Sequence, residues 1–227
     1  MIYIGIDDTD MLDTRGTGHL ARQIAAELAT DYSLLGVTRH QLSSDPRVPC
    51  THKNSSAVIH LDAPADAVQQ IMKRVEKLMH NEFVPGSDPG LCVTAVVPKA
   101  ITQFGLKAKK TFVFQSEARV LANAHGLLLK GLGGTEDGVI GALAAVGLAA
   151  GGSDGRYIIV GRVRDLAGLQ PVDALLQAGV MAVQTSDGTP VHDGMVLTDK
   201  VRPARRNGRP VAIVQWQGDH WLPLKLD

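Results

Sequence analysis

The sequence predicts an α/β (α+β) protein that ends in a small antiparallel β module. Short β-branched runs alternate with stretches of helical periodicity over most of the chain. The Ala- and Gly-rich apolar stretch at 139–150 is too short to span a bilayer and is typical of a buried helix. Beyond Pro171, turn signals recur at short intervals with β-type runs between them.

Four strands and two helices are expected before residue 98. The strands are residues 2–6, 32–38, 57–61 and 91–97, and the helices are residues 19–30 and a segment that starts near Pro64. The polar segment at 42–54 contains two prolines and is expected to be a loop. Residues 57–97 run strand–helix–loop–strand, which is close to half of a ferredoxin-like unit.

The second half is expected to begin with a strand at 107–114. Ser116 is a good N-cap for a helix that stops at Gly126. A Gly-rich loop, the apolar helix and a strand at 157–163 follow. After a short helix at 172–177, the turns Asp-Gly, Asn-Gly and Gly-Asp predict an antiparallel meander, with a domain boundary near residue 170.

Composition restricts the class of protein. Lys plus Arg and Asp plus Glu number 23 each, so the formal net charge of the 227-residue chain is zero. Nucleic-acid-binding proteins usually carry a basic excess, so an RNA site would have to be a local patch. The two cysteines, the lack of a signal peptide and the lack of a membrane-length apolar run lead us to expect a cytoplasmic protein without membrane contact.

Three carboxylates follow the first strand at once. Asp7, Asp8 and Asp10 would repel one another, and a hard divalent cation would remove that cost. Magnesium prefers oxygen ligands and is usually shared between one or two carboxylates and substrate phosphates. The pattern therefore predicts a metal and phosphate site. A solvated turn in which an Asp caps the next helix remains the alternative.

A Gly/Thr segment leads from this loop into the first helix. Gly16, Thr17 and Gly18 would offer free N–H groups and the positive end of a helix dipole to an anion. Thr17 is equally well explained as a simple N-cap.

A second candidate loop precedes the apolar helix. Gly133, Gly134 and Gly138 would let the backbone approach a phosphate, and Lys130 would supply charge. The loop is not a Walker A motif, because no Gly-Lys-Ser/Thr follows the glycines. A tight turn before a buried helix is the alternative. The acidic pair at 136–137 argues against direct phosphate contact unless a second cation is present.

Two further groups are candidates for binding. Five cations surround the Asn-Gly turn at 207–208 and would bind RNA phosphates or protect an edge strand: Lys200, Arg202, Arg205, Arg206 and Arg209. Cys50 and His52 are spaced like two ligands on one strand face, but without further close ligands zinc is not expected.

Two motifs in this order resemble a known family. They are Ile4-Gly-Ile-Asp-Asp-Thr-Asp10 and Val139-Ile-Gly-Ala-Leu-Ala-Ala-Val-Gly147, joined by matching segments that begin at Lys53 and Asp88. Over about residues 1–165 they resemble the catalytic core of archaeal tRNA-isoleucine 2-agmatinylcytidine synthetase. That family uses ATP and magnesium in tRNA modification. The resemblance implies that the three aspartates hold magnesium, that Thr17 lies near the transferred phosphate, and that Lys53 contacts the nucleotide.

The resemblance also implies a domain plan. Residues 1–56 and 112–168 would form a kinase-like ATP- and magnesium-binding core, and residues 57–111 would form an inserted ferredoxin-like unit. The turn signals place the small β module at residues 171–227. The family's zinc ribbon is missing here, because the chain lacks four clustered Cys or His ligands. The ATP chemistry is thus better supported than the tRNA substrate.

Three functions follow as hypotheses. The first is an ATP- and magnesium-dependent transferase or ligase that activates an oxygen on a small molecule or an RNA base. The second is an aspartate-based phosphatase built on Asp8-Thr-Asp10, although Leu12 stands where such enzymes usually have Thr or Val. The third is a non-catalytic nucleotide-binding sensor or partner subunit, which the acidic pair at 136–137 favours. The oligomeric state stays open.

Overall fold

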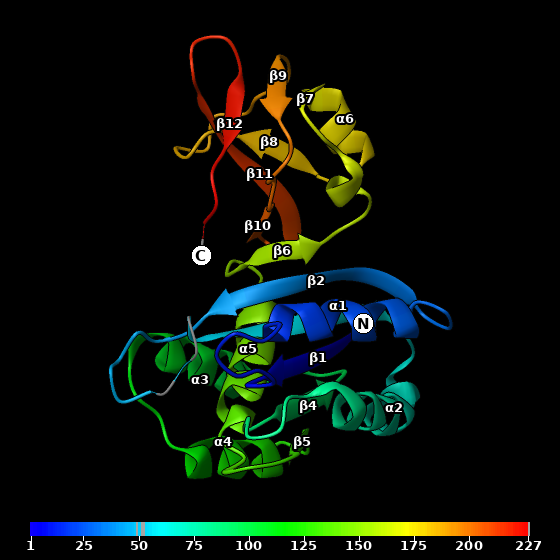
Figure 1. Cartoon of the computed structure of the whole chain (residues 1–227), viewed down its shortest axis with the longest axis vertical. Helices are drawn as coiled ribbons and strands as arrows, with labels where there is room; N and C mark the ends of the chain where they lie inside the picture. Colours follow the sequence, from blue (N-terminus) through cyan, green and yellow to red (C-terminus); the bar gives the residue numbers. More distant parts are fainter. Residues whose placement is uncertain (49, 51–52, 227) are drawn as a thin grey trace.

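The computed structural model describes residues 1–48, 50 and 53–226 (Figure 1). The described strands form a 12-stranded sheet in the order β5-β4-β1-β3-β2-β6-β10-β11-β12-β9-β7, with β8 paired to β11. Helices cover the first part of this sheet, and a β-rich C-terminal part extends from its β6 side (Figure 1). The fold is therefore mixed α/β, as the sequence predicts, and its strands form one large, mostly antiparallel sheet.

The N-terminal part has the order β-α-β-β-α-β. Its elements are β1 (Ile2–Asp7), α1 (Thr17–Leu28), β2 (Ser33–Gln41), β3 (Ser55–Asp62), α2 (Val68–Glu82) and β4 (Gly90–Thr94), with a 3₁₀ turn η1 (Ala65–Ala67) before α2. Strand β1 pairs antiparallel with β3 on one side and β4 on the other. This is the ferredoxin-like arrangement. It starts at residue 2, and β3 and β4 from the expected unit at 57–111 pair with β1 in one sheet.

Helices pack on both faces of these strands. Helices α1 and α2 cover one face through a cluster that includes Ile4, Ile24 and Ile71. The other face carries α3 (Lys99–Lys110), α4 (Gln115–Ala124) and α5 (Gly138–Gly151), with β5 (Leu128–Gly131) at the sheet edge. Strand β1 is thus buried on both sides, which explains its continuous apolar sequence.

Helix α5 lies directly on the strand backbones because glycines leave room for it. A Cβ added at Gly5 would lie 2.2 Å from the Ala142 carbonyl oxygen, and one at Gly90 would lie 2.0 Å from the Gly138 carbonyl carbon. Both distances are far below van der Waals contact. The close approach brings the first turn of α5 beside the end of β1, where the acidic loop begins.

The prediction of a strand at residues 107–114 is wrong, because residues 99–110 form the helix α3. Ile101, Phe104 and Ala108 are buried at helical spacing on α5. Gly105 is also buried on this face of α3, but a glycine does not count as an apolar position in the sequence pattern. A Cβ added at Gly105 would lie 2.5 Å from the Ala144 carbonyl oxygen. The glycine is therefore needed for helix–helix contact. The next helix is capped by Phe114 rather than by Ser116.

The C-terminal part is joined to the sheet through β6 (Arg156–Ile159), which pairs with β2 and β10. The other elements are η2 (Val163–Asp165), β7 (Leu169–Pro171), α6 (Val172–Gln177), β8 (Ala182–Gln184), β9 (Met195–Leu197), β10 (Ala204–Arg206), β11 (Arg209–Trp216) and β12 (Trp221–Pro223). The pairs β8–β11 and β9–β12 are parallel, so the module is not a purely antiparallel meander. Its core begins at Tyr157, before the boundary expected near residue 170.

Arg205 ties the C-terminal part to α5. Its side chain is 5% exposed and donates to the Ala149 carbonyl at 3.1 Å, the Tyr157 hydroxyl at 2.5 Å and the Gly208 carbonyl at 3.0 Å. Arg205 is thus a buried structural residue, and its expected role in binding nucleic acid is wrong.

Arg205→Leu is expected to lower the free energy of unfolding by roughly 3 kcal/mol, because several buried acceptors would lose their donor. Urea unfolding measures the change. Arg209→Leu, at an exposed position on the same hairpin, is the matched control and is expected to change the free energy by less than about 0.5 kcal/mol. Equal effects of the two substitutions would contradict the structural role of Arg205.

Candidate functional site

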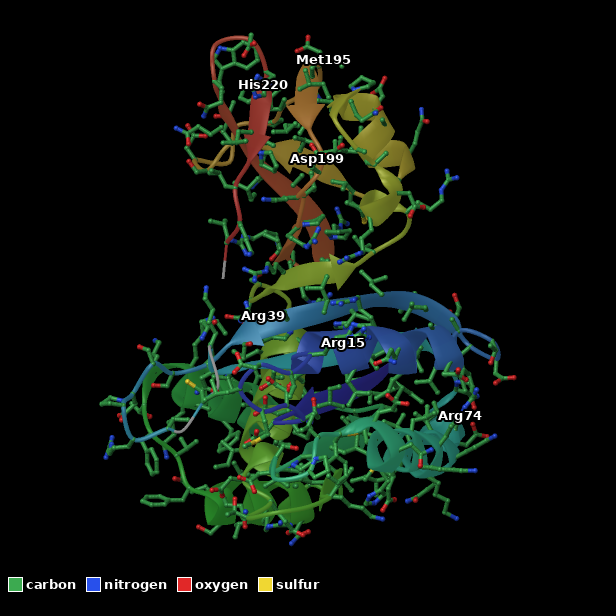
Figure 2. All side chains as sticks on the ribbon, viewed as in Figure 1. Arg15, Arg39, Arg74, Met195, Asp199 and His220 are labelled. Atoms are coloured by element: carbon green, nitrogen blue, oxygen red, sulfur yellow. The ribbon has the colours of Figure 1, made fainter. Side chains whose placement is uncertain are left out.

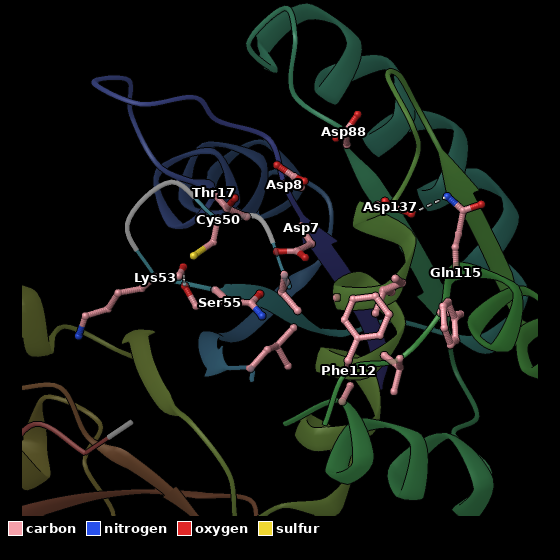
Figure 3. Close-up of a pocket in the computed structure, with 18 of the residues that line it drawn as sticks. Asp7, Asp8, Thr17, Cys50, Lys53, Ser55, Asp88, Phe112, Gln115 and Asp137 are labelled. Atoms are coloured by element: carbon pink, nitrogen blue, oxygen red, sulfur yellow. Dashed lines mark hydrogen bonds between the residues drawn. The ribbon is translucent and has the colours of Figure 1, made fainter. Parts of the chain in front are cut away.

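A cavity of about 400 Å³ opens where β1 ends. Its polar wall carries five aspartates that come from three separate segments: Asp7, Asp8, Asp10, Asp88 and Asp137. Figure 3 shows Asp7, Asp8, Asp88 and Asp137 around the end of this strand. The three carboxylates predicted from the sequence therefore do lie in one cavity, and the fold adds two more.

Asp7 and Asp8 are held in an environment that resists ionisation. Burial, and next the charge of Asp8, raise the pKa of Asp7 to about 7. Burial, and then the charges of Asp88, Asp10 and Asp137, raise the pKa of Asp8 to about 6. Without a cation, the cavity therefore binds protons near neutral pH.

A neighbouring serine completes the environment of Asp7. The Ser56 hydroxyl is buried without a hydrogen-bond partner of good geometry, although it is close enough to Asp7 to lower the pKa of that carboxyl. Both side chains pack closely against Gly141 of α5. A Cβ added at Gly141 would lie 1.8 Å from Asp7 Oδ2 and 2.6 Å from Ser56 Oγ. Only a glycine leaves the carboxylate in this position.

Asp10 has a structural bond as well as a place on the cavity wall. Its Oδ1 accepts the Thr17 backbone N–H at 3.0 Å and the Thr17 hydroxyl at 2.9 Å. The Thr17 hydroxyl in turn lies 3.2 Å from the hydroxyl of buried Thr9. Gly16, and not Thr17, is the N-cap residue of α1. The helix is thus capped from the acidic loop, as the alternative interpretation of an Asp cap predicts.

Asp88 and Asp137 are the site residues that sequence reasoning did not select. Asp88 Oδ1 accepts the Thr135 N–H at 2.6 Å, which fixes the Gly-rich loop against β4. Asp137 Oδ1 accepts a hydrogen bond from Gln115 Nε2 at 3.1 Å (Figure 3). Two features of the sequence could have indicated these residues. Asp88 begins the Asp88-Pro-Gly90 segment that resembles the known family, and Asp137 belongs to the acidic pair in the Gly-rich loop, which is compatible with a phosphate only if a second cation is bound.

The Gly-rich loop does not place its glycines as expected. Gly133 packs near Phe83, and Gly134 adopts a positive φ of 58° beside Asp88. Gly138 packs against the backbone of β4. The cavity wall is formed instead by residues 137, 140 and 141. The tight-turn alternative thus describes these glycines.

Lys130 is also placed away from the aspartates. It lies on β5, and its ammonium group donates to both carboxylate oxygens of Glu76 on α2, at 3.0 and 2.8 Å. Lys130 is therefore paired with Glu76 on α2, and it does not line the acidic cavity.

A second cavity of about 370 Å³ adjoins the first. It is lined by Gly16, Gly18, Arg39 and Lys53, and it shares Asp10, Thr17, Lys53 and Ser55 with the acidic cavity. Gly16, Thr17 and Gly18, which were predicted to bind an anion, therefore line one cavity together with Arg39 and Lys53. Figure 3 shows the Lys53 side chain extending away from the aspartates.

The acidic cavity is also lined by apolar and aromatic side chains. They are Leu42, Val48, Ala108, Phe112, Val113, Phe114 and Ile140. The Arg47 guanidinium lies over the Phe112 ring at 4.7 Å, and Phe114 meets the same ring edge-on at 5.1 Å. Because residues 107–114 were expected to form a strand, sequence reasoning did not place these rings in the same cavity as the aspartates.

The residues present suit magnesium in one specific way. In the part of the chain that the structure describes, no three His, Cys, Asp or Glu side chains form a ready-made metal-binding group. Carboxylates with raised pKa values in a shared cavity nevertheless provide oxygen ligands and a reason to bind a cation. The donor set therefore fits an ion that shares its coordination with phosphate oxygens and water.

The remaining candidates are scattered. Lys200 and Arg209 are exposed, while Arg206 donates to the Arg205 carbonyl at 3.0 Å. Cys50 lines the acidic cavity, whereas His52 lies outside the described residues. Across the described ranges, no helix is long and apolar enough to cross a membrane.

The chain is similar to known proteins over about two thirds of its length. No protein-family model matches the chain. Over 153 residues, or 65% of its length, the chain is 28% identical to tRNA(Ile2) 2-agmatinylcytidine synthetase TiaS of Pyrococcus horikoshii, of which the match covers 35%. This part of the chain resembles TiaS. An uncharacterised protein of Methanocaldococcus jannaschii is also 28% identical, over 65% of this chain and 50% of its own length.

Solved structures support the same likeness. A tRNA fluorescent labeling enzyme and a complex of TiaS with tRNA(Ile2) and ATP match 64% of the chain, with TM-scores of 0.57 and 0.55 and 22% identity. The match covers 35% and 36% of those chains. At this identity the likeness shows a shared fold. The chain spans about a third to a half of the length of its curated relatives.

Proposed function

We propose that this chain is an ATP- and magnesium-dependent enzyme that activates an oxygen acceptor by phosphoryl or nucleotidyl transfer, in the manner of a ligase. The resemblance to TiaS, whose structures include complexes with ATP and tRNA(Ile2), supports a nucleotide-using role in tRNA modification. Because the matched part is only about a third of TiaS, the substrates of the whole relative are proposals for this chain.

The observation that carries the proposal is the mixed lining of one cavity. Five carboxylates line it together with aromatic and aliphatic side chains. A nucleoside triphosphate needs both kinds of surface, because its base stacks on apolar groups and its phosphates need cations. The base would lie near Phe112, and the phosphates would lie near Asp7 and Asp8 with bound magnesium.

Each residue then has a defined task. Asp7 and Asp8 would lose their protons to hold the cation, and Asp88 and Asp137 would attract a second cation. The cation would neutralise phosphate charge, which is the main requirement of phosphoryl transfer. Asp10 would hold Thr17 at the N-terminus of α1, so that the hydroxyl and nearby N–H groups face the phosphates. The acceptor would be an RNA base or a small molecule.

Isothermal titration with a non-hydrolysable ATP analogue tests the proposal. Binding is expected with magnesium and is expected to be lost in EDTA, because the aspartates repel phosphates without a cation. At a hundred times the dissociation constant, the ligand should stabilise the fold by about 2.7 kcal/mol. That corresponds to roughly 5–10 °C in the melting temperature.

Two results would contradict the proposal. One is the absence of binding with magnesium at millimolar analogue concentrations. The other is a phosphorylated Asp8 trapped after reaction with a phosphate ester, which would favour the aspartate-based phosphatase instead. Binding of the analogue without hydrolysis of ATP, in the presence of RNA and small-molecule acceptors, would favour the non-catalytic sensor.

A further inference from the structure

Arginines from distant parts of the chain gather around β6. Arg22 on α1 donates to the Gly18 carbonyl at 2.9 Å, and a Cβ on Gly18 would lie 3.4 Å from the Ile158 side chain. Arg164 in η2 donates to the carbonyl of the same Ile158 at 3.2 Å. Both guanidinium groups are therefore held close to one β6 residue.

A third arginine joins them from the C-terminal part. Arg202 precedes Pro203, whose carbonyl accepts the Tyr157 N–H at 2.7 Å and so fixes this segment to β6. Burial, and next the charges of Arg164 and Arg202, lower the pKa of Arg22. Burial, followed by the charge of Arg164, lowers the pKa of Arg202. We call Arg22, Arg164 and Arg202 the arginine cluster.

The arginine cluster is not neutralised by the protein. Its hydrogen bonds go to main-chain carbonyls and, from Arg22, to the His19 ring at 3.3 Å. Within residues 1–48, 50 and 53–226, none of the three forms an ion pair with a carboxylate. Arg164 is exposed and the other two are partly exposed. Such a group attracts an anion, and guanidinium groups match phosphate best.

Further cations connect the cluster to the acidic cavity. Arg15 lies 3.1 Å from the His19 ring, next to Arg22 (Arg15 is labelled in Figure 2). The second cavity is lined by Gly18, Arg39 and Lys53 and opens onto Asp10 and Thr17 of the acidic cavity. The positive charges thus follow a path rather than forming one closed pocket.

We propose that the arginine cluster binds backbone phosphates of a single-stranded RNA segment, and that this segment leads toward the acidic cavity. The proposal deepens the proposed function and rests on it only for the step in which a base enters that cavity. A path of cations suits a polymer with regularly spaced phosphates, whereas a single phosphate would need one closed site. A base that reaches a cavity must be unstacked, which single strands and loops allow.

Fluorescence anisotropy with a labelled RNA of about 12 nucleotides tests the proposal. The variant Arg22→Gln, Arg164→Gln, Arg202→Gln is compared with Lys73→Gln, Lys77→Gln, Lys99→Gln, which removes equal charge from exposed lysines on α2 and α3. The arginine variant is expected to bind at least ten-fold more weakly. Its salt dependence should fall by about 2 in the log–log slope, at about 0.7 for each lost contact.

A charge-retaining variant, with Lys at all three positions, guards against misfolding and is expected to keep most of the salt dependence. The proposal is overturned if the control lysine variant loses as much affinity, or if the arginine variant loses none. It is also overturned if polyglutamate competes as well as RNA does, since this would indicate an acidic protein partner.

Titration of the unmodified protein with magnesium and the ATP analogue separates this proposal from the proposed function. If the protein binds RNA through the arginine cluster but does not bind the nucleotide, the RNA-binding proposal stands and the proposed ATP-dependent function fails. If it binds the nucleotide but not RNA, the proposed function stands and the RNA-binding proposal fails.

Discussion

Asp7→Asn is expected to make the ligand-free protein more stable at neutral pH. Burial and the charge of Asp8 raise the pKa of Asp7 to about 7, so ionising this carboxylate costs folding free energy. The amide removes that cost. The gain at pH 7 should be on the order of 3 kcal/mol, and a melting temperature higher by roughly 6–12 °C would report it.

The pH dependence has a definite sign. When the pKa of a carboxyl group is higher in the folded protein than in the unfolded chain, the protein loses stability as the pH rises from the unfolded pKa to the folded pKa. The difference between Asp7→Asn and the unmodified protein should therefore be near zero at about pH 4 and should grow up to about pH 7. Thermal melts over this range, in EDTA, measure it.

The same substitution should abolish stabilisation by magnesium with the ATP analogue, because one oxygen ligand and its charge are lost. Asp62→Asn, at an exposed position on β3, is the matched control. It should change neither the stability of the ligand-free protein nor the stabilisation by magnesium with the ATP analogue. A destabilised Asp7→Asn protein in EDTA would show that Asp7 has a structural bond that outweighs its repulsion. Unchanged nucleotide binding would remove Asp7 from the proposed site.

Gly90→Ala is expected to destabilise the protein strongly, because the added methyl group would clash with the backbone of α5. The new Cβ would lie 2.0 Å from the Gly138 carbonyl carbon and 2.3 Å from the Val139 nitrogen. Both are backbone atoms of α5, so no side-chain rotation relieves the clash. A loss of roughly 3 kcal/mol or more is expected, with weaker nucleotide binding because Asp137 is the N-cap residue of α5.

Gly133→Ala is the control for this substitution. A Cβ there would be 3.5 Å from the Phe83 ring, which is ordinary contact, and the free energy of unfolding should change little. Chemical denaturation measures both variants, and titration with the ATP analogue measures binding. If Gly90→Ala were as stable as Gly133→Ala, α5 would not lie on the strands as closely as the structure places it.

Local patterns in the sequence determined much of this protein. A run of apolar residues ended by three aspartates predicts a buried strand with an acidic exit, because period and polarity depend only on neighbours in the chain. The same reasoning predicts α1, α2, α5 and the short helix α6. The motifs around Asp7 and Gly141 also indicate the resemblance to TiaS.

Pairing and burial were decided by tertiary structure. Nothing local shows that β3 and β4 flank β1, that Gly105 marks a helix contact, or that Arg205 is buried. Asp88 joins Asp7 because β4 pairs with β1, and Asp137 joins them because α5 lies on the strand backbones. The raised pKa values of the aspartates, and the cluster of arginines around β6, depend on charges brought together through space, and a single sequence does not show which charges will meet.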